Sequence, residues 1–543
     1  MSGLQEKLII GLGNPGKKYI NNRHNVGFLL IQRLIEKHNS KISSKNKIKC
    51  QYSEFNANGN LYRIFMPTTF MNNSGEAVKA IIDWFKNSMT PLLSINPSNG
   101  MVIKSYPQYS YERITKILNY ATEAQNNWKN TNLKFRLERI KQLSEIVSER
   151  KIEYASLMAQ EMGKPLKQGI GEIEKCIWLC NYYILNSDEF LKDKTIETGG
   201  QKSFVTIQPI GLVLGIMPWN FPFWQVFRFA VPAIIAGNST LVKHAPNVQG
   251  SAIAIEKIFH AAGLPKDVFR ILMIDIDIIP EIISDKMIKA VSLTGSEFAG
   301  SKVAECSGKN LKKTVLELGG ADAFIVLNDA NLVKCVDSAI KGRMLNNGQS
   351  CIAAKRFIVH ENIYNEFLEM LKNSVSSLQV GNPMLDDTQV GPLARLDILD
   401  KIQLQVDESI ALGANLVYGG KKVGNLGYFY SPTILTDITK DMPVYSQETF
   451  GPVFSVFKCS NIQQMIDLAN DTDFGLGGSV WSEDQEKALS LAHKIETGAV
   501  FINDFMKSDP RLPFGGVKKS GYGRELSEFG IKEFVNVKTI AIF

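Results

Sequence analysis

Strand-like and helix-like segments alternate from about Leu92 to Phe543, and this alternation restricts the fold more than any other feature. The apolar runs GLVLGIMP (211–218) and STLVKH (239–244) are typical of buried strands. A helical pattern that ends at a glycine follows them, and AVSLTGS (290–296), a further helix and KTVLELGG (313–320) continue the series. This order predicts a parallel, Rossmann-like sheet of the α/β class.

The composition excludes several classes of protein. At 44% hydrophobic and 21% charged residues, the chain resembles an ordinary soluble protein, and no apolar run approaches the roughly 18 residues of a membrane helix. Seven cysteines without a repeating spacing argue against a disulfide framework and for a reducing, cytoplasmic location. The six histidines lack partners at ligand spacing, so we expect no metal site.

The charge is unevenly distributed along the chain. Residues 1–90 contain 13 Lys and Arg against 5 Asp and Glu, a net charge of +8 compared with +7 for the whole chain. Such a block is usually a solvated surface, although it can also contact nucleic acid. With the Ser-, Asn- and Pro-rich segment 86–100, it indicates two unequal parts that join at about residues 86–93.

Near the start, LIIGLGNPG contains the spacing Gly11-x-Gly13-x-x-Gly16 of a dinucleotide-binding turn. Its context does not fit, because Pro15 precedes the third glycine. The first acidic residue after Glu6 is Glu36, which lies within an amphipathic helical pattern rather than at a strand end. We therefore expect no nucleotide at this turn.

The motifs GLGNPGKKY, RHNVGF and PTTFMNNSGEAV instead resemble bacterial peptidyl-tRNA hydrolase. The resemblance implies that Asn14, His24 and Asn72 occupy catalytic or substrate-binding positions, with His24 as the general base. It covers only about residues 1–85, and the family's later acidic residue, which orients the base, has no counterpart before the sequence changes at 94–100. We expect a truncated α/β segment without hydrolase activity.

In the second part, three segments contain side chains suited to carbonyl chemistry. Cys351 follows a Gly-Gln-Ser turn at the start of an alanine-rich, helix-like stretch, where the helix dipole would favour a thiolate. Glu317 lies in an apolar strand, where desolvation would raise the pKa of its carboxyl group, as suits a general base. Asn220 lies on a turn after a strand and could donate to an oxyanion. The structural alternatives are a buried inert thiol, a Glu bound to backbone amides and a turn-capping Asn.

A fourth segment, LTGS (293–296), ends a strand and opens a helix, as phosphate sites do, although Ser296 could simply cap that helix. Taken together, these segments resemble the aldehyde dehydrogenases over about residues 92–543. The motifs that carry the resemblance occur in the family's order: EMGKP, IMPWNFP, LVKHAP, LTGS, LELGG, NNGQSC, QETFGPV and PFGGVKKSGYGRE.

The resemblance implies a catalytic mechanism and a domain plan. Cys351 is then the nucleophile, Glu317 the base and Asn220 the oxyanion donor, together with the Cys351 N–H. A Rossmann-like cofactor domain would span 94–325 with an arm hairpin at about 196–211. A catalytic domain would span 326–520, and a C-terminal helix and oligomerisation strand 521–543, in a homodimer or homotetramer.

The same resemblance assigns the cofactor site. Lys243 would bond the adenine-side ribose, Gly295 and Ser296 would bond the pyrophosphate, and Glu448 would bond the nicotinamide ribose. The other predicted cofactor-binding residues are Trp219 and Phe450. Many relatives that prefer NAD have a Glu three residues after this lysine, where this chain has Pro246. Without that carboxylate a 2′-phosphate would meet no like charge, so we expect NADP to be preferred and NAD tolerated.

The substrate prediction depends on Arg228, which lies two helical turns after Asn220, and on Ser508. A guanidinium and a hydroxyl in the pocket would suit an aldehyde with a distal carboxylate, although Arg228 could instead form a structural ion pair. Aromatic residues would line the tunnel between: Phe223, Trp224 and Phe227. The motifs here look like the succinate-semialdehyde dehydrogenase branch, which implies oxidation of succinate semialdehyde to succinate. Peptidyl-tRNA hydrolysis or RNA binding by the first 85 residues are the alternatives.

Overall fold

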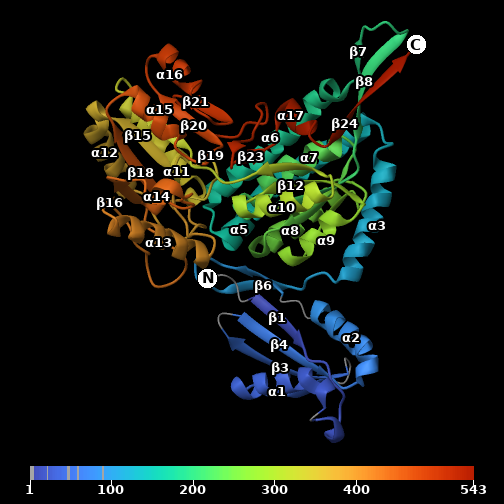
Figure 1. The fold of residues 1–543 in the computed structure, drawn as a ribbon. Coiled ribbons are helices and arrows are strands. Elements are labelled where there is room, and N and C mark those ends of the chain that lie inside the picture. The colour runs from blue at the N-terminus through green and yellow to red at the C-terminus, as the bar shows by residue number, and fades with distance from the viewer. Residues whose placement is uncertain (1–4, 21, 46–48, 58–59, 88–90) are drawn as a thin grey trace. The chain divides into compact units, whose positions relative to one another are not determined.

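A computed structural model describes residues 5–20, 22–45, 49–57, 60–87 and 91–543 (Figure 1). The chain divides into two compact units, which are described separately below. The first comprises Met1–Pro91 with Ser110–Glu112, and the second Leu92–Tyr109 with Arg113–Phe543. Among the described residues, no helix is both long and apolar enough to cross a membrane.

The first unit contains a four-stranded sheet in the order β1-β4-β3-β2. Only the β1–β4 pair is parallel. The strands are β1 (Gln5–Ile10), β2 (Ser43–Lys45), β3 (Cys50–Ala57) and β4 (Asn60–Pro67), and the helices are α1 (Val26–Lys37) and α2 (Ser74–Asn87). Short 3₁₀ turns precede both helices. The fold is therefore α/β, as the sequence predicts.

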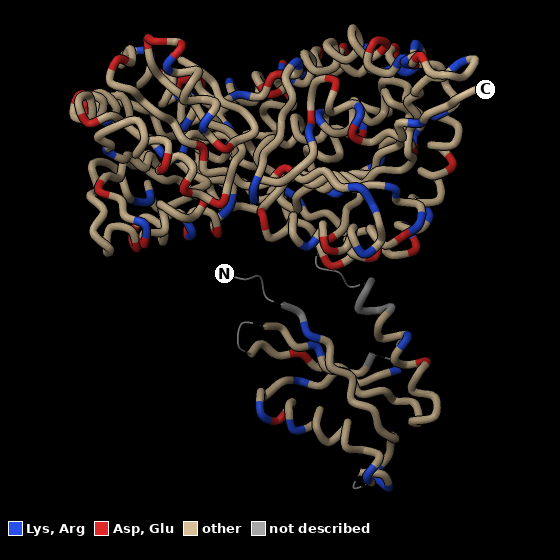
Figure 2. The backbone as a smooth tube through the Cα atoms, turned by 45° about the horizontal axis from the view of Figure 1, so that its top comes forward, with Lys and Arg blue, Asp and Glu red and all other residues tan. Residues whose placement is uncertain are grey.

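The core of the first unit is small, and apolar side chains remain on its surface. Ile31, Ile64 and Phe65 are at most 1% exposed, whereas Val26 is 65% and Phe70 56% exposed. Lys and Arg outnumber Asp and Glu along this unit (Figure 2). The uncovered apolar residues agree with a segment that corresponds to only part of a domain.

The second unit begins with a β-hairpin and four helices. The hairpin consists of β5 (Leu92–Ile95) and β6 (Val102–Tyr106). The helices are α3 (Tyr111–Trp128), α4 (Leu133–Glu149), α5 (Lys151–Met162) and the 26-residue α6 (Leu166–Leu191). Their buried faces contribute to one large apolar core together with α7 and the sheet described next.

A six-stranded sheet in the order β11-β10-β9-β12-β13-β23 confirms the predicted Rossmann-like architecture. Its first five strands are parallel, and the short β23 is antiparallel. Parallel strands covered on both faces are buried along their length, and every residue of β10 is buried, including its polar residues. The strands are β9 (Leu212–Met217), β10 (Ser239–His244), β11 (Phe269–Ile271), β12 (Ile288–Thr294), β13 (Lys313–Glu317) and β23 (Gly521–Tyr522); the helices are α7 (Pro222–Ile235), α8 (Gln249–Ala261), α9 (Ile279–Ser284) and α10 (Glu297–Lys309).

A second sheet has seven strands in the order β16-β17-β18-β15-β14-β20-β21. All neighbours pair in parallel except β16 with β17. Its strands are β14 (Ala323–Val326), β15 (Arg356–His360), β16 (Asn415–Tyr418), β17 (Thr433–Thr436), β18 (Val453–Cys459), β20 (Gly477–Trp481) and β21 (Ala499–Ile502). The accompanying helices are α11 (Leu332–Met344), α12 (Glu361–Ser376), α13 (Leu396–Ala411), α14 (Pro443–Ser446), α15 (Ile462–Asn470) and α16 (Gln485–Ala492).

A three-stranded sheet projects from the second unit (Figure 1). Strands β7 (Lys194–Ile196) and β8 (Lys202–Pro209) form the hairpin expected at about residues 196–211, and β24 (Val535–Ile542) pairs antiparallel with β8 along its whole length. The remaining elements are α17 (Ser527–Ile531) and the two-stranded pair β19 (Phe474–Gly475) and β22 (Val517–Lys518).

Candidate active site

Cys351 lies on a tight turn between α11 and β15. Asn346, Asn347 and Gly348 have φ angles of 56°, 59° and 76°, so three consecutive residues adopt the left-handed conformation before it. The expected helix after Cys351 is wrong, because residues 351–355 form a turn and irregular backbone. The Lys355 ammonium donates to the carbonyl oxygens of Ser350 (3.1 Å) and Cys351 (2.7 Å), so a side chain satisfies groups that a helix would have paired.

The electrostatics of Cys351 consequently differ from the prediction. Burial raises the pKa of its thiol to about 12, while the positive charges of Arg228 and Lys355 act in the opposite direction. No helix begins at Cys351, so the predicted dipole of such a helix is missing. The thiol is therefore neutral in the free protein, and its activation depends on nearby cations and on a proton acceptor.

Asn220 lies where the sequence predicts it, on the turn between β9 and α7. Its side chain is buried, and Nδ2 donates to the Gln349 carbonyl at 3.1 Å. Asn346 Nδ2 in turn donates to the Asn220 carbonyl oxygen at 2.7 Å. These bonds tie Asn220 to the segment that carries Cys351, and the second hydrogen of its amide is available to a developing oxyanion.

Replacing Asn220 with alanine should lower kcat by roughly 10²–10³-fold, the usual loss when one oxyanion donor is removed. The effect should fall on kcat rather than on the KM for aldehyde, because the oxyanion develops only after attack. Steady-state kinetics, with the melting temperature as a check on folding, measure this. A variant with unchanged kcat would remove Asn220 from the mechanism.

Glu317 ends β13 and is buried, at 2% exposure. Neither of its carboxylate oxygens has a hydrogen-bond partner among the described residues, so the alternative of a Glu bound to backbone amides is wrong. Burial raises the pKa of the Glu317 carboxyl well above its usual value, and the nearby carboxyl of Glu525 raises it further, whereas Arg228 lowers it. The environment is therefore that of a proton acceptor with increased basicity.

A cavity of about 290 Å³ lies beside Cys351 and contains most of the predicted cofactor residues. Trp219 and Phe450 contact edge to face there, with ring centroids 5.7 Å apart. Glu448 accepts a hydrogen bond from the Gly320 N–H at 3.0 Å. The predicted residues in its lining are Trp219, Asn220, Gly295, Ser296, Cys351, Glu448 and Phe450.

Lys243 is the one predicted cofactor residue that does not line this cavity. It lies next to the end of β10 and is only 4% exposed. Burial lowers the pKa of its ammonium to about 8, against an opposing contribution from Asp275. A buried cation is costly, and a phosphate or ribose oxygen beside it would offset part of that cost.

The donor groups around this cavity fit a dinucleotide. The N-terminus of α10 has free backbone N–H groups and a helix dipole of the kind suited to a pyrophosphate, and Thr294 has a buried hydroxyl without a partner among the described residues. Ser296 also caps α10, because its hydroxyl accepts the Ala299 N–H at 3.3 Å. The capping role and a phosphate-binding role are compatible, since only one lone pair is used.

Sequence reasoning missed the wall of this cavity that comes from α13 and the residue before it. Arg395 and Asp397 form an ion pair with each other there. The other missed lining residues from this segment are Ile398, Lys401 and Ile402. No motif marks them, because they reach the cavity through tertiary packing of a helix with an ordinary amphipathic pattern.

A second cavity, of about 220 Å³, meets the first at Cys351. It contains Arg228 and Ser508, as predicted, but Arg228 forms an ion pair with Glu525, and its guanidinium lies 4.6 Å from the centre of the Phe514 ring. Arg228 therefore lines the pocket, as the substrate prediction requires, and also forms the structural ion pair that was the alternative. The cavity also contains Lys175 of α6, which sequence reasoning missed.

The predicted aromatic tunnel is only partly correct. Trp224 lines the second cavity, whereas Phe223 and Phe227 are fully buried and contact Tyr154 and Phe259 instead. One helical turn carries side chains in all directions, so neighbouring aromatic residues cannot all face one cavity. The other aromatic walls are Phe221 and Phe514.

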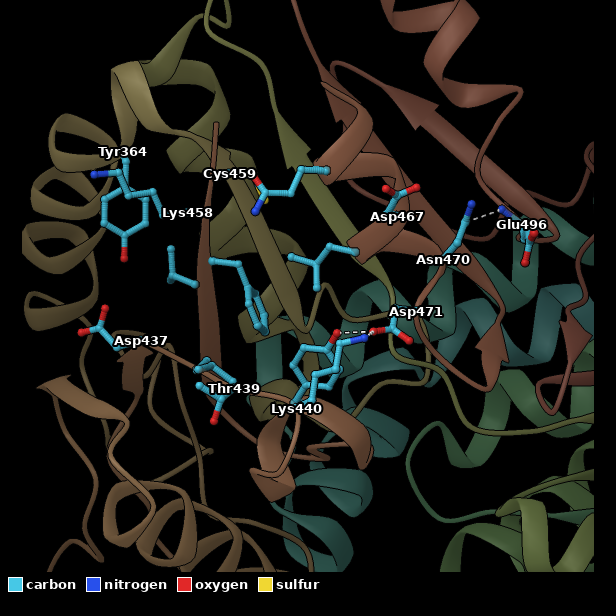
Figure 3. A pocket seen from close by; sticks show the side chains of 16 residues that line it. Tyr364, Asp437, Thr439, Lys440, Lys458, Cys459, Asp467, Asn470, Asp471 and Glu496 are labelled. Carbon is cyan, nitrogen blue, oxygen red and sulfur yellow. Dashed lines mark hydrogen bonds and ion pairs between the residues drawn. The ribbon is translucent and has the colours of Figure 1, made fainter. Parts of the chain in front are cut away.

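A larger hollow of about 920 Å³ lies elsewhere in the second unit and is lined by both polar and apolar side chains (Figure 3). Lys440 pairs with Asp471 at 2.6 Å there, and the Tyr445 hydroxyl also bonds Asp471. It contains none of the predicted site residues. We therefore place the reaction at Cys351, between the two smaller cavities.

One cavity formed by described residues of the first unit contains only part of the predicted set. A cavity of about 270 Å³ includes Asn14 but neither His24 nor Asn72. Asn14 Oδ1 accepts the Met71 N–H at 2.8 Å, and the His24 ring lies 3.1 Å from the side-chain oxygen of Asn22. The recorded partner of His24 is thus an amide and not an orienting carboxylate.

Comparison with known proteins gives two family matches and many relatives. The aldehyde dehydrogenase family model matches residues 84–540, and the peptidyl-tRNA hydrolase model matches residues 8–97. A Synechocystis protein described as "Probable succinate-semialdehyde dehydrogenase", with NADP(+), is 46% identical over 83% of this chain and 99% of its own length. The Escherichia coli succinate semialdehyde dehydrogenase Sad, with NAD(P)+, is 41% identical over 83% of this chain and 98% of its own.

Solved structures agree with these matches. The succinic semialdehyde dehydrogenase of Streptococcus pyogenes, solved with NADP+, has a TM-score of 0.82 and 38% identity, and the match covers 83% of this chain and 99% of that one. The family model, the relatives and the solved structures all match the second unit, which contains Cys351, Asn220 and Glu317. This chain belongs to the aldehyde dehydrogenase family.

Proposed function

We propose that this protein oxidises succinate semialdehyde to succinate with NADP as its preferred cofactor. The observation that carries the proposal is that Cys351 lies in the lining of both cavities, one suited to a dinucleotide and one containing cationic side chains. A substrate in one cavity and a cofactor in the other would meet at this thiol. The names of relatives such as the Synechocystis protein support the same substrate and cofactor.

The first half of the reaction requires a nucleophile and an oxyanion donor. The Cys351 thiol releases its proton to solvent water, favoured by the positive charges of Arg228 and Lys355. The resulting thiolate attacks the aldehyde carbon, and the carbonyl oxygen becomes an oxyanion that the Asn220 amide stabilises. A nicotinamide cofactor held in the neighbouring cavity would supply the acceptor for the hydride that leaves this carbon. Trp219 and Phe450 line the cavity beside Cys351 and would position the cofactor there, and departure of the hydride leaves Cys351 bound to the substrate as a thioester.

The second half requires a base. Glu317 removes a proton from water, the resulting hydroxide attacks the thioester carbon, and the Cys351 sulfur leaves as the thiolate. The carboxylate of Glu317 can take this proton because its buried setting raises its pKa. The products are the carboxylic acid and the regenerated nucleophile.

Absorbance of the reduced cofactor, followed with a panel of aldehydes, tests this function. We expect the highest kcat/KM with succinate semialdehyde, well above that with butanal, which has the same chain length without the carboxylate. Equal kcat/KM values for the two aldehydes would reject the substrate assignment while leaving aldehyde oxidation intact.

For the cofactor, we predict a kcat/KM for NADP at least tenfold above that for NAD. The reason is that the chain has Pro246 where a carboxylate would repel the 2′-phosphate, and that Lys243 provides a nearby positive charge. Titration with each cofactor at a fixed aldehyde concentration measures the ratio. A tenfold preference for NAD would contradict this assignment.

We propose further that the enzyme is a cytoplasmic homo-oligomer. All seven cysteines are free, which suits a reducing compartment. Strand β24 is an edge of the projecting sheet, and its Val537 and Ile542 are 62% and 46% exposed, a pattern that favours pairing with another chain. Light scattering of the purified chain tests the oligomeric state.

For the first unit we propose no hydrolase activity, because the cavity of about 270 Å³ formed by its described residues includes Asn14 but neither His24 nor Asn72, and the ring of His24 contacts the amide of Asn22 and no orienting carboxylate among those residues. Incubation of the full chain with peptidyl-tRNA should leave the ester intact, and cleavage that disappears in His24→Ala would overturn this proposal.

A further inference from the structure

Arg343 of α11 is a fully buried arginine to which the mechanism above gives no role. Its guanidinium bonds backbone carbonyl groups and forms no ion pair with a carboxylate of the described residues. Nε donates to the Val453 oxygen at 2.6 Å, Nη2 to the oxygens of Thr449 (2.9 Å) and Gly451, and Nη1 to that of Gly348 at 3.4 Å. A buried cation without a counter-charge is costly, so these carbonyl groups replace the water that the guanidinium loses.

The four carbonyl groups belong to two segments of the candidate active site. Three of them lie in residues 449–453, here called the cofactor segment, which follows Glu448 and includes Phe450. The side chains of Glu448 and Phe450 line the cavity of about 290 Å³. The fourth carbonyl belongs to Gly348, in the left-handed turn before Cys351, here called the nucleophile turn. The guanidinium therefore links the cofactor segment to the nucleophile turn.

The two segments are in direct backbone contact at Gly348. A Cβ atom at this position would overlap the carbonyl group of Gly451 and lie 2.8 Å from the backbone nitrogen of Pro452. Such a close approach of two backbones leaves no room for a side chain between them. The position of the cofactor segment relative to the nucleophile is thus set at this contact, and the Arg343 guanidinium bonds the carbonyl groups on both sides of it.

The nucleophile turn has further bonds of its own. Asn347 Nδ2 donates to the carbonyl oxygens of Gly163 and Pro392 at 2.9 and 3.0 Å, and the Lys355 ammonium bonds the Cys351 carbonyl. In contrast, no other side chain among the described residues bonds the carbonyl groups of the cofactor segment. Loss of the guanidinium should therefore displace the cofactor segment more than the nucleophile turn.

We propose that Arg343 is a positioning residue, which fixes Glu448 and Phe450 relative to the nucleophile turn and thereby determines how tightly the dinucleotide is held beside Cys351. This inference rests on the proposed function, because it requires a dinucleotide in that cavity. An arginine suits this role, since its planar fork reaches several acceptors at fixed angles. Burial lowers the pKa of Arg343 to about 9, and the negative charge of Glu448 acts in the opposite direction. The guanidinium is thus attracted to the carboxylate that it positions.

The test compares Arg343→Met and Arg343→Lys with the control Arg356→Lys. Arg356 is also buried, and its guanidinium donates to the carbonyl oxygens of Ala321, Leu468 and Ala469 at 2.8, 2.7 and 2.7 Å. None of these three residues lines the cavity of about 290 Å³. The control therefore matches Arg343 in burial and in the type of its acceptors, but it does not bond the cofactor segment.

Two measurements are made on each protein, and neither depends on aldehyde oxidation. The dissociation constant of NADP is obtained without aldehyde, from quenching of tryptophan fluorescence. Hydrolysis of p-nitrophenyl acetate is followed without cofactor. This ester has its own leaving group, so its hydrolysis needs the Cys351 thiol but no hydride acceptor.

In Arg343→Met, the dissociation constant of NADP should rise roughly 10- to 100-fold, as expected for loss of hydrogen bonds from a charged group. Ester hydrolysis should stay within about threefold of wild type, because the nucleophile turn keeps its other bonds. Arg343→Lys keeps the charge without the planar fork, so its dissociation constant should rise less, by roughly 3- to 10-fold. Arg356→Lys should match wild type in both measurements.

The outcomes separate this inference from the proposed function. A wild-type protein that binds neither NADP nor NAD would overturn both. If wild type binds NADP and Arg343→Lys binds it equally tightly, this inference alone is overturned. An equal loss of NADP binding and ester hydrolysis in the Arg343 variants would also overturn it, because an arginine with a merely structural role would affect both. The same rise in the dissociation constant in Arg356→Lys would overturn it as well.

Discussion

Replacing Cys351 with alanine should lower aldehyde oxidation by about 10⁴-fold or more, the scale of loss when a covalent nucleophile is removed. The physical reason is that an aldehyde has no leaving group other than hydride, and hydride departs only after a nucleophile has added to the carbonyl carbon. Formation of reduced cofactor, followed under saturating succinate semialdehyde and NADP, measures the loss.

Cys306 provides a matched control, because it is a partly exposed thiol of the same unit that lies outside both cavities. Cys306→Ala should retain the wild-type rate. An undiminished rate in Cys351→Ala, or a comparable loss in Cys306→Ala, would place the nucleophile elsewhere.

The second large effect is expected in Glu317→Gln. Its steady-state rate should fall by roughly 10²–10⁴-fold, the usual contribution of a general base, because water is no longer activated to release the acid. Reduced cofactor should still form in a burst of one equivalent per site, since hydride leaves before the thioester is hydrolysed. Stopped-flow absorbance resolves the burst from the steady state.

The pH dependence provides a second measurement on Glu317. The pKa of this carboxyl is raised well above its usual value, and only the ionised form accepts a proton from water. The rate of thioester hydrolysis should therefore rise with pH through the raised pKa in wild type and lose this dependence in Glu317→Gln. Glu305→Gln, an exposed control paired with Lys302, should keep the wild-type profile. A Glu317→Gln variant with no burst, or with a normal steady-state rate, would contradict the assigned role.

The sequence was sufficient to predict where the proposed site residues at strand ends lie in the fold. Asn220 follows β9 and Glu317 ends β13, and both strands belong to the parallel sheet that the strand-helix alternation predicts. In such a sheet the carboxyl ends of the strands meet at one edge. The strand order along the sequence is therefore enough to predict that the residues after these strands lie near one another. Ser296, after β12, is near the site for the same reason.

Other features depend on contacts between distant segments and could not be predicted. The turn at Cys351 looked like a helix because alanines have high helix propensity, but the Lys355 ammonium binds the carbonyls that a helix would use. The pairing of Arg228 with Glu525 joins residues almost 300 positions apart. Lys175 lines the cavity and belongs to the long helix α6. The apolar pattern of this helix predicts which of its residues are buried, but not that this lysine faces a cavity.

The central claim is that the carbonyl carbon becomes covalently bound to Cys351 during turnover. Mixing Glu317→Gln with succinate semialdehyde and NADP, followed by acid quench and peptide mass spectrometry, tests this claim most directly. We predict one succinyl group per chain, located on the peptide that contains Cys351. A quenched enzyme that has formed reduced cofactor but carries no acyl group, or carries it on another cysteine, would contradict the account.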